Sequence, residues 1–168
     1  LTANANATVN GNLNEFYRPF EYQLKTLLQV NNVLFSAVSP NKHFICFLLL
    51  SNGTLSAKFY STDNKSQPVL FPINSNQQIS SIALSNSKVL AIGFKTGIIN
   101  LFYSSNKSRT LRWHIDEVTA LSFSSDNNYL LSGGLEKVLV FWQMNSDKKQ
   151  FLPRLSGPIL NISNSPTY

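Results

Sequence analysis

The sequence predicts an all-β protein made of about three copies of a four-stranded unit and the start of a fourth. The first observation is an internal repeat of about 40 residues. The second is the composition of the expected strands, which are short and rich in β-branched and aromatic residues, as at 98–102 and 138–142. This pattern favours strands over helices. No amphipathic helix longer than a few turns is evident.

Each repeat opens with an apolar strand that ends in a serine-containing turn. The four copies begin at Val33, Ile79, Val118 and Ile159, which lie 46, 39 and 41 residues apart. After the first three copies we expect a second strand, a third strand that ends in aromatic residues, and a weaker fourth strand. The second strands are expected at 44–50, 89–93 and 130–134, the third to end at Phe59-Tyr60, Phe102-Tyr103 and Phe141-Trp142, and the fourth at 69–71, 110–113 and 150–152.

Four short strands separated by turns make one blade of a β-propeller. We therefore expect blades at 33–76, 77–116 and 117–156 and the start of the next at 157–168. For 15–32 we expect the last strand of a preceding blade. Residues 1–14 are mostly Asn, Ala, Thr and Gly, with too little apolar material to offset the entropy of ordering, which predicts a flexible linker or loop.

The composition fits a globular protein, and its net charge bears on the class of partner. The chain has 168 residues, 43% of them hydrophobic, and a net charge of +6 from 14 Lys and Arg against 8 Asp and Glu. A basic balance favours polyanions such as nucleic acid as partners, but it equally describes a soluble module.

The single cysteine, Cys46, lies in an apolar run and predicts a core thiol in a reducing compartment. Without a long apolar stretch, a signal peptide or an initiator Met, we expect a soluble fragment and no membrane partner.

The third repeat resembles the WD40 repeat through four residues: His114, Ser132, Glu136 and Trp142. In that family these positions form a hydrogen-bonded tetrad inside the blade, so the resemblance implies a structural role and a partial WD40 propeller. The family normally has Asp where this chain has Glu136. The residue after the tryptophan is Gln143 instead of Asp, and the residue before the histidine is Trp113 instead of Gly.

The other two repeats lack this set of polar residues. The second has Thr96 and Phe102 at the acid and tryptophan positions, and the first has Asn52 or a neighbour, with Phe59 near the aromatic position. We expect these two blades to be held by apolar packing.

Residues 110–166 are also similar to a WD-repeat subunit family of the nucleolar t-UTP (UTP-A) subcomplex of the small-subunit processome. The resemblance lies in three stretches, at 112–114, 130–140 and 151–155. It implies a non-enzymatic nucleolar scaffold that associates with other protein subunits, with pre-rRNA or the U3 snoRNP nearby, and supports RNA polymerase I transcription and 18S rRNA maturation. The Asn-rich composition is typical of fungal members.

Basic residues in the second and third repeats are the candidates for RNA or partner contact: Lys107, Arg109, Arg112, Lys148, Lys149 and Arg154. At the rim of a propeller such residues can neutralise phosphates. A scattered, solvated surface is the alternative for each of them, and for Arg154 we favour a structural role.

No enzyme is predicted. The two histidines and one cysteine cannot supply the usual zinc ligands, and phosphate-binding loops are absent, so we expect no metal, cofactor or small-molecule substrate. His114, Ser132 and Glu136 superficially offer a hydrolase triad, but Ser132 lies within an expected strand and no G-x-S-x-G elbow is present. The alternatives are a generic cytoplasmic WD40 adaptor that binds a peptide and, more remotely, a hydrolase with its site at a central channel.

Overall fold

The protein forms three four-stranded antiparallel sheets, each a simple meander. The computed structural model describes residues 30–62, 69–73, 76–104, 106–153 and 155–164, and this part of the chain contains no helix. The first sheet consists of β1 (Val33–Val38), β2 (Phe44–Ser51), β3 (Thr54–Ser61) and β4 (Val69–Pro72). The second consists of β5 (Ile79–Leu84), β6 (Leu90–Phe94), β7 (Ile98–Ser104) and β8 (Lys107–Arg112). The third consists of β9 (Ala120–Phe123), β10 (Tyr129–Gly133), β11 (Leu139–Gln143) and β12 (Lys149–Leu152).

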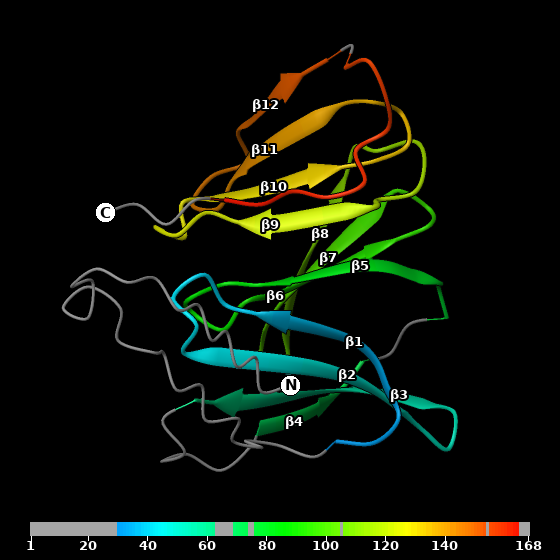
Figure 1. Ribbon diagram of the computed structural model, residues 1–168, viewed down its shortest axis with the longest axis vertical. Coiled ribbons are helices and arrows are strands. Elements are labelled where there is room, and N and C mark those ends of the chain that lie inside the picture. Colours follow the sequence, from blue (N-terminus) through cyan, green and yellow to red (C-terminus); the bar gives the residue numbers. More distant parts are fainter. Residues whose placement is uncertain (1–29, 63–68, 74–75, 105, 154, 165–168) are drawn as a thin grey trace, which may run out of the picture.

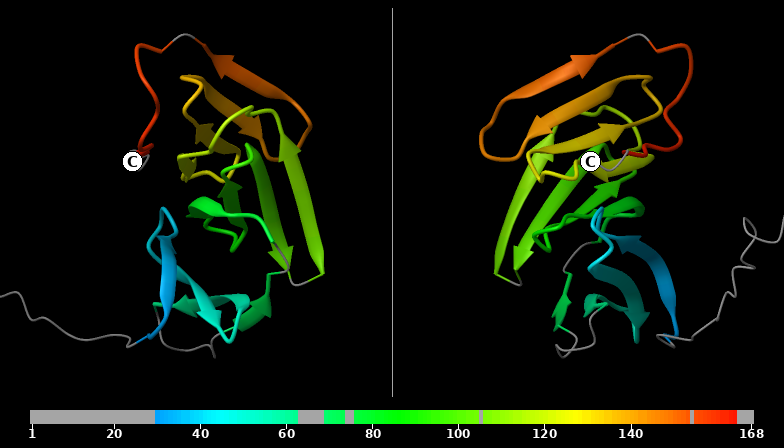
Figure 2. Two further views of the ribbon diagram at one scale, coloured as in Figure 1. Left: turned by 90° about the vertical axis from the view of Figure 1, so that its right-hand side faces the viewer. Right: turned by 60° about the vertical axis from the view of Figure 1, so that its left-hand side comes forward.

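The three sheets follow one another as the blades of an open, partial propeller, with β1, β5 and β9 as their inner strands (Figures 1 and 2). Because each blade is a meander, its turns fall alternately at two ends. We call the end that carries the β1–β2, β5–β6, β7–β8, β9–β10 and β11–β12 turns the β1–β2 rim. The β2–β3 rim carries the β2–β3, β6–β7 and β10–β11 turns and the connections between blades. In Figure 1 the β1–β2 rim lies at the left-hand ends of β1, β2, β9 and β10.

Local sequence explains the tight turn between β2 and β3. Ser51 pairs with Thr54 across a two-residue connection, Asn52-Gly53. Both connecting residues have positive φ, 50° at Asn52 and 76° at Gly53. Asn-Gly tolerates this left-handed backbone, and such a turn matches the twist of the two strands that it joins.

Two apolar cores lie between neighbouring blades. The first joins Cys46, Leu48 and Phe59 of the first blade to Leu90, Ile92 and Phe94 of β6. The second joins Ala91, Ile99 and Leu101 of the second blade to Leu130, Val140 and Trp142 of the third. All five residues of β6 are buried, because the middle blade has a neighbour on each face. Side chains at alternate positions along β6 therefore pack into different cores.

Glycines on β6 and β10 let the segments around Val118 and Ile159 approach these strands closely. A Cβ added to Gly93 would lie 2.5 Å from Ser81 Oγ and 2.9 Å from Val118 Cγ1, and one added to Gly133 would lie 2.5 Å from Ile159 Cγ2. Ser81 Oγ donates to Val118 O at 2.6 Å, and the Thr119 hydroxyl donates to Ile159 O. Ile159 thus docks on the third blade as Val118 docks on the second.

The expected fold class is confirmed: the described chain is all β, with three four-stranded blades of a partial propeller. The strand expected within 15–32 and the linker at 1–14 fall outside the described residues, except for residues 30–32, which are not in a strand. Residues 157–164 are not assigned as a strand either, because the first strand of a blade pairs with the second strand of that same blade. No described residue follows Asn164 to pair with this segment.

We predict that Gly93→Ala lowers the free energy of unfolding by about 1–3 kcal/mol, since the added methyl group overpacks a contact between two blades. Urea denaturation of the purified protein measures this loss. Gly157→Ala is the matched control, because nothing lies within 4 Å of a Cβ added there. Equal stability of the two variants would contradict the close approach at Gly93.

Candidate functional site

The structure brings the four WD40-like polar residues together inside the third blade. His114 lies in the connection after β8, Ser132 on β10, Glu136 in the β10–β11 turn and Trp142 on β11. Trp142 Nε1 donates to Ser132 Oγ at 2.7 Å, and Ser132 Oγ lies 2.6 Å from His114 Nε2. His114 Nδ1 is hydrogen-bonded to Glu136 Oε1. The result is one chain of hydrogen bonds, from the indole through the hydroxyl and the imidazole to the carboxylate.

With an ionised carboxylate and a neutral imidazole, the chemistry of these groups gives the hydrogen bonds one direction. An ionised carboxylate only accepts, so the bond to Glu136 requires the proton on His114 Nδ1. In the neutral ring Nε2 then accepts the Ser132 proton, which leaves the hydroxyl oxygen free to accept from the Trp142 indole. Because His114 and Ser132 are 6% and 0% exposed, water cannot replace these partners, and each bond removes a desolvation penalty.

Glu136 is longer than the Asp that the WD40 pattern leads one to expect, and the neighbouring backbone accommodates it. Its second oxygen, Oε2, is buried and has no hydrogen-bond partner among the described residues. A Cβ added to Gly134 would lie only 2.4 Å from that oxygen and 2.6 Å from Glu117 O. Residue 134 must therefore lack a side chain for the longer acid to reach His114.

Ser132, His114 and Glu136 are hydrogen-bonded in the order of a hydrolase triad, but the Ser132 hydroxyl is not accessible to a substrate. A nucleophilic serine must reach a substrate carbonyl from a turn, with its proton free to move to the base. Ser132 is fully buried on β10, and its oxygen also accepts from Trp142 Nε1. These hydrogen bonds link four side chains of one blade, and Ser132 Oγ is buried among them.

The first two blades have apolar and aromatic groups where the third has the Ser132–Trp142 pair. Strand pairing sets Leu90 opposite Phe102 as it sets Leu130 opposite Trp142. Phe102 therefore occupies the tryptophan position of the second blade, where Ile92 replaces the serine.

In the first blade the matching register places Tyr60 at the tryptophan position, one residue beyond Phe59. Its ring packs edge-on against Phe47, with the centroids 5.7 Å apart. Apolar and aromatic contacts thus replace the polar chain of the third blade.

The basic candidates do not form one group. Lys107, Arg109, Lys148 and Lys149 lie towards the β1–β2 rim, where Arg109 forms an ion pair with Asp147 at 2.7 Å. Arg112 ends β8 at the opposite rim. Lys149 Nζ lies over the Trp142 ring, 5.5 Å from its centroid. Arg154 lies outside the described residues.

Sequence reasoning missed a row of asparagines that links the three blades at the β1–β2 rim. The Asn41 N–H donates to Asn86 Oδ1 at 2.8 Å, and the Asn86 N–H donates to Asn127 Oδ1 at 2.9 Å. The repeated serine turns were the available signal. The side-chain hydroxyls of Ser39, Ser85 and Ser124 accept from the Phe44, Val89 and Tyr129 N–H respectively, so the same kind of bond closes each turn, although the second turn is one residue shorter.

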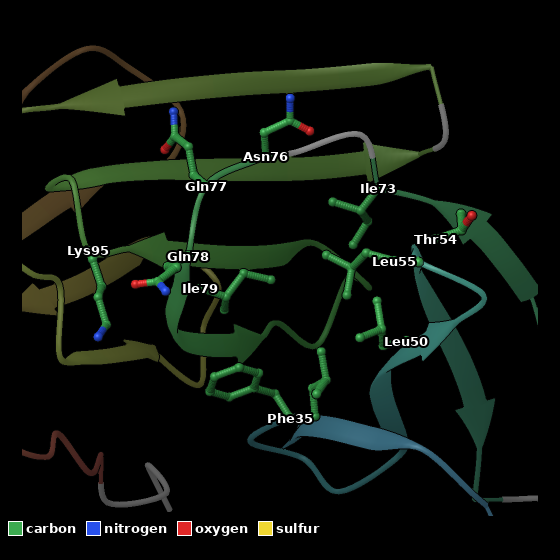
Figure 3. A pocket seen from close by; sticks show the side chains of 12 residues that line it. Phe35, Leu50, Thr54, Leu55, Ile73, Asn76, Gln77, Gln78, Ile79 and Lys95 are labelled. Atoms are coloured by element: carbon green, nitrogen blue, oxygen red, sulfur yellow. The ribbon is translucent and has the colours of Figure 1, made fainter.

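A hollow of about 790 Å³ lies at the β2–β3 rim between the first two blades (Figure 3). Phe35, Leu50, Leu55 and Ile73 line one side, and the amides of residues 76–78 and Lys95 line the other. The Thr96 hydroxyl donates to Gln77 Oε1 at 2.9 Å. Among the described residues that line this hollow, Lys95 is the only one with a charged side chain.

Other kinds of site were sought in the same part of the chain. The described residues contain no group of three or more His, Cys, Asp or Glu placed to hold a metal ion. They also contain no helix that is long and apolar enough to cross a membrane. Cys46 is fully buried, and burial raises the pKa of its thiol to about 12, so the thiol stays protonated and unreactive.

The sheets, their order around the inner strands and the polar chain of the third blade define blades of a WD40-type propeller. Solved structures agree on this fold. The WD40 repeats of RRP9 match with a TM-score of 0.58 at 17% identity, over 75% of this chain and 40% of that one. A chain of a mitotic checkpoint complex matches with a TM-score of 0.56 at 19% identity, over 73% of this chain and 37% of that one.

Sequence comparison identifies a family within the WD40-type propellers. The family model described as the first β-propeller of WD repeat-containing protein 75 matches residues 47–168, and the chain belongs to this family. NET1-associated nuclear protein 1 of Saccharomyces cerevisiae is 33% identical over 160 residues, which cover 84% of this chain and 18% of that protein. U3 small nucleolar RNA-associated protein 17 of Schizosaccharomyces pombe is 36% identical over 96 residues, covering 55% and 12% respectively.

The human relative, WD repeat-containing protein 75, is 46% identical over 83 residues, which cover 46% of this chain and 10% of that protein. The chain thus spans less than a fifth of the length of these relatives. The resemblance that the sequence indicated, to nucleolar WD-repeat subunits, is confirmed at the level of the family.

We predict that Ser132→Ala destabilises the protein more than Trp142→Phe. The alanine leaves both the Trp142 N–H and His114 Nε2 buried without a partner, which costs about 3 kcal/mol. The phenylalanine removes one donor but keeps an aromatic ring and the Ser132–His114 bond, for a loss of about 1 kcal/mol. Urea denaturation measures both losses, and the opposite order would show that Ser132 is not the centre of the hydrogen-bonded chain.

We also predict that Cys46 resists alkylation by iodoacetamide at pH 8.5 in the folded protein and reacts in 6 M guanidinium. Mass spectrometry of the Cys46 peptide measures the difference. The folded pKa of about 12 lies above the ordinary value of 9.0, so the thiol's contribution to stability is complete below pH 9 and is lost as the pH rises from 9 to 12. Rapid alkylation of the folded protein would contradict the burial.

Proposed function

We propose that this chain is part of a non-enzymatic scaffold in a nucleolar pre-ribosomal complex, the small-subunit processome. There it supports rRNA transcription by RNA polymerase I and the maturation of 18S rRNA. The observation that carries the proposal is the family match over residues 47–168. Two of the similar proteins are named for the nucleus and for U3 small nucleolar RNA, which favours the nucleolus over the cytoplasm of a generic adaptor.

The absence of catalysis is part of the proposal. What supports it is the use of the polar residues: His114, Ser132 and Trp142 are buried and hydrogen-bonded to one another. Their proposed role, with Glu136, is to hold the third blade together. The three hydrogen bonds satisfy groups that would otherwise destabilise the core.

Protein subunits are the main proposed partners. The outer strands present apolar side chains to solvent, with Val69 and Leu70 on β4 exposed by 58% and 59% and Leu152 on β12 exposed by 49%. Exposed apolar side chains grouped on one element are typical of surfaces that bind proteins. Contact with pre-rRNA through Lys107, Arg109, Lys148 and Lys149 is a further proposal, supported by their position towards one rim.

The test is to immunoprecipitate the tagged full-length protein from cells at moderate and at high salt and to sequence the RNA that is recovered. We expect enrichment of 5′ pre-rRNA and U3 snoRNA together with proteins of the same complex. A tagged WD40 protein of the cytoplasm serves as the control. Recovery of cytoplasmic proteins alone, without pre-rRNA, would overturn the proposal.

A further inference from the structure

The charges of the described residues are distributed unequally between the two rims. The β1–β2 rim and the strand ends next to it carry six cations and two carboxylates, Asp126 and Asp147. The cations are Lys42, Lys88, Lys107, Arg109, Lys148 and Lys149. At the β2–β3 rim, three cations meet three carboxylates, namely Lys95, Arg112 and Lys137 with Asp116, Glu117 and Glu136. The excess positive charge at the rims therefore lies on one face of the propeller.

The basic rim also contains a hollow of about 380 Å³ between the second and third blades, a size within the usual range of small-ligand sites. Its lining includes Tyr103, Met144 and the amide side chains of Asn127, Asn128 and Asn145. An aromatic ring provides a surface for stacking a nucleobase, and amides offer both donors and acceptors to its edge.

A cation and a carboxylate beside this hollow would bind different parts of a nucleotide, the phosphate and the base. Lys107 Nζ lies 5.4 Å from the centroid of the Tyr103 ring, so a phosphate held by Lys107 would bring its base beside Tyr103. Asp126 also lines the hollow and is exposed, and its pKa is lowered by the Ser124 hydroxyl and then by the Asn128 N–H. This ionised carboxylate repels phosphates but accepts hydrogen bonds from the amino groups of bases.

The rim is held in place before any ligand binds. Asn86 Nδ2 donates to Ser125 O at 2.7 Å, in addition to the Asn41–Asn86–Asn127 row described above. The Arg109 guanidinium on β8 donates to Ser146 O and to Asp147 Oδ1 in the β11–β12 turn. These contacts join neighbouring blades, so little ordering is required on binding.

We propose that the β1–β2 rim binds single-stranded RNA, with phosphates along its lysines and one base in the hollow beside Tyr103. The choice of RNA over another polyanion rests on the proposed function. The surface itself rests on the charge distribution and on the lining of the hollow. It adds Lys42 and Lys88 to the residues that the sequence indicated, and it leaves out Arg112.

The test measures binding of the purified full-length protein to a fluorescent 20-nucleotide oligouridine by anisotropy at several salt concentrations. The triple variant K88Q/K107Q/K148Q removes three cations from the basic rim, and K95Q/R112Q/K137Q removes three from the other rim as the matched control. We expect the first variant to weaken binding at least about tenfold and to reduce the salt slope by about 2, as loss of three contacts to single-stranded phosphates requires. The control should change the affinity less than about twofold.

A second variant tests the base in the hollow separately. Tyr103→Leu keeps an apolar side chain but removes the stacking surface, and we expect it to weaken oligouridine binding about tenfold. It should leave binding of an abasic oligonucleotide of the same length unchanged. Circular dichroism and urea denaturation of every variant identify any loss of folding.

Three results would overturn the inference: equal losses in the two triple variants, no effect of Tyr103→Leu, or displacement of the RNA by polyglutamate as effective as by unlabelled oligouridine. The last would indicate an acidic protein segment as the occupant. Immunoprecipitation of the wild-type protein tests the proposed function separately from the rim assignment. If pre-rRNA still comes down with the wild-type protein while the oligouridine results fail, the rim assignment falls and the scaffold role stands.

Discussion

The middle blade must be covered on both of its faces, and the rest of the structure depends on this constraint. Leu90, Ile92 and Phe94 pack towards the first blade, while Ala91, Ile99 and Leu101 pack towards the third. A single four-stranded sheet cannot bury both of its own faces, so blades gain their stability from their neighbours. Gly93 on β6 and Gly133 on β10 let the segments around Val118 and Ile159 approach closely enough for this packing, because a methyl group at either glycine would overlap those residues.

Polar groups within this apolar framework either form hydrogen bonds inside and between blades or lie on the surface, where they can contact a partner. In the third blade, hydrogen bonds link Trp142, Ser132, His114 and Glu136. In the first blade, the rings of Phe47 and Tyr60 are in contact instead. The asparagine row joins all three blades at the basic rim. Buried polar groups are thus used for the fold, and the groups left for recognition lie at the rims, which suits a protein that binds others.

Much of the fold could be predicted from the sequence, because the repeat imposes the same strand order on every blade. The serine turns and aromatic strand ends marked the blades, and the spacing of His114, Ser132, Glu136 and Trp142 pointed to one blade. Contacts between repeats could not be read in this way, since Asn41, Asn86 and Asn127 are distant in sequence and resemble ordinary turn residues. The division of Arg112 from Arg109 also required the fold, because only alternation of strand direction sends the two ends of β8 to opposite rims.

The most direct test of this account is amide hydrogen exchange in the full-length protein, followed by mass spectrometry of peptides. If blades are stable only side by side, β6 should exchange slowest, β10 should open together with it, and the outer strands β4 and β12 should exchange much earlier. The Ser132→Ala variant should speed exchange in the third blade first. Contradiction would come from a third blade that exchanges as a unit of its own, with protection independent of β6, because its stability would then come from its polar chain and not from its neighbours.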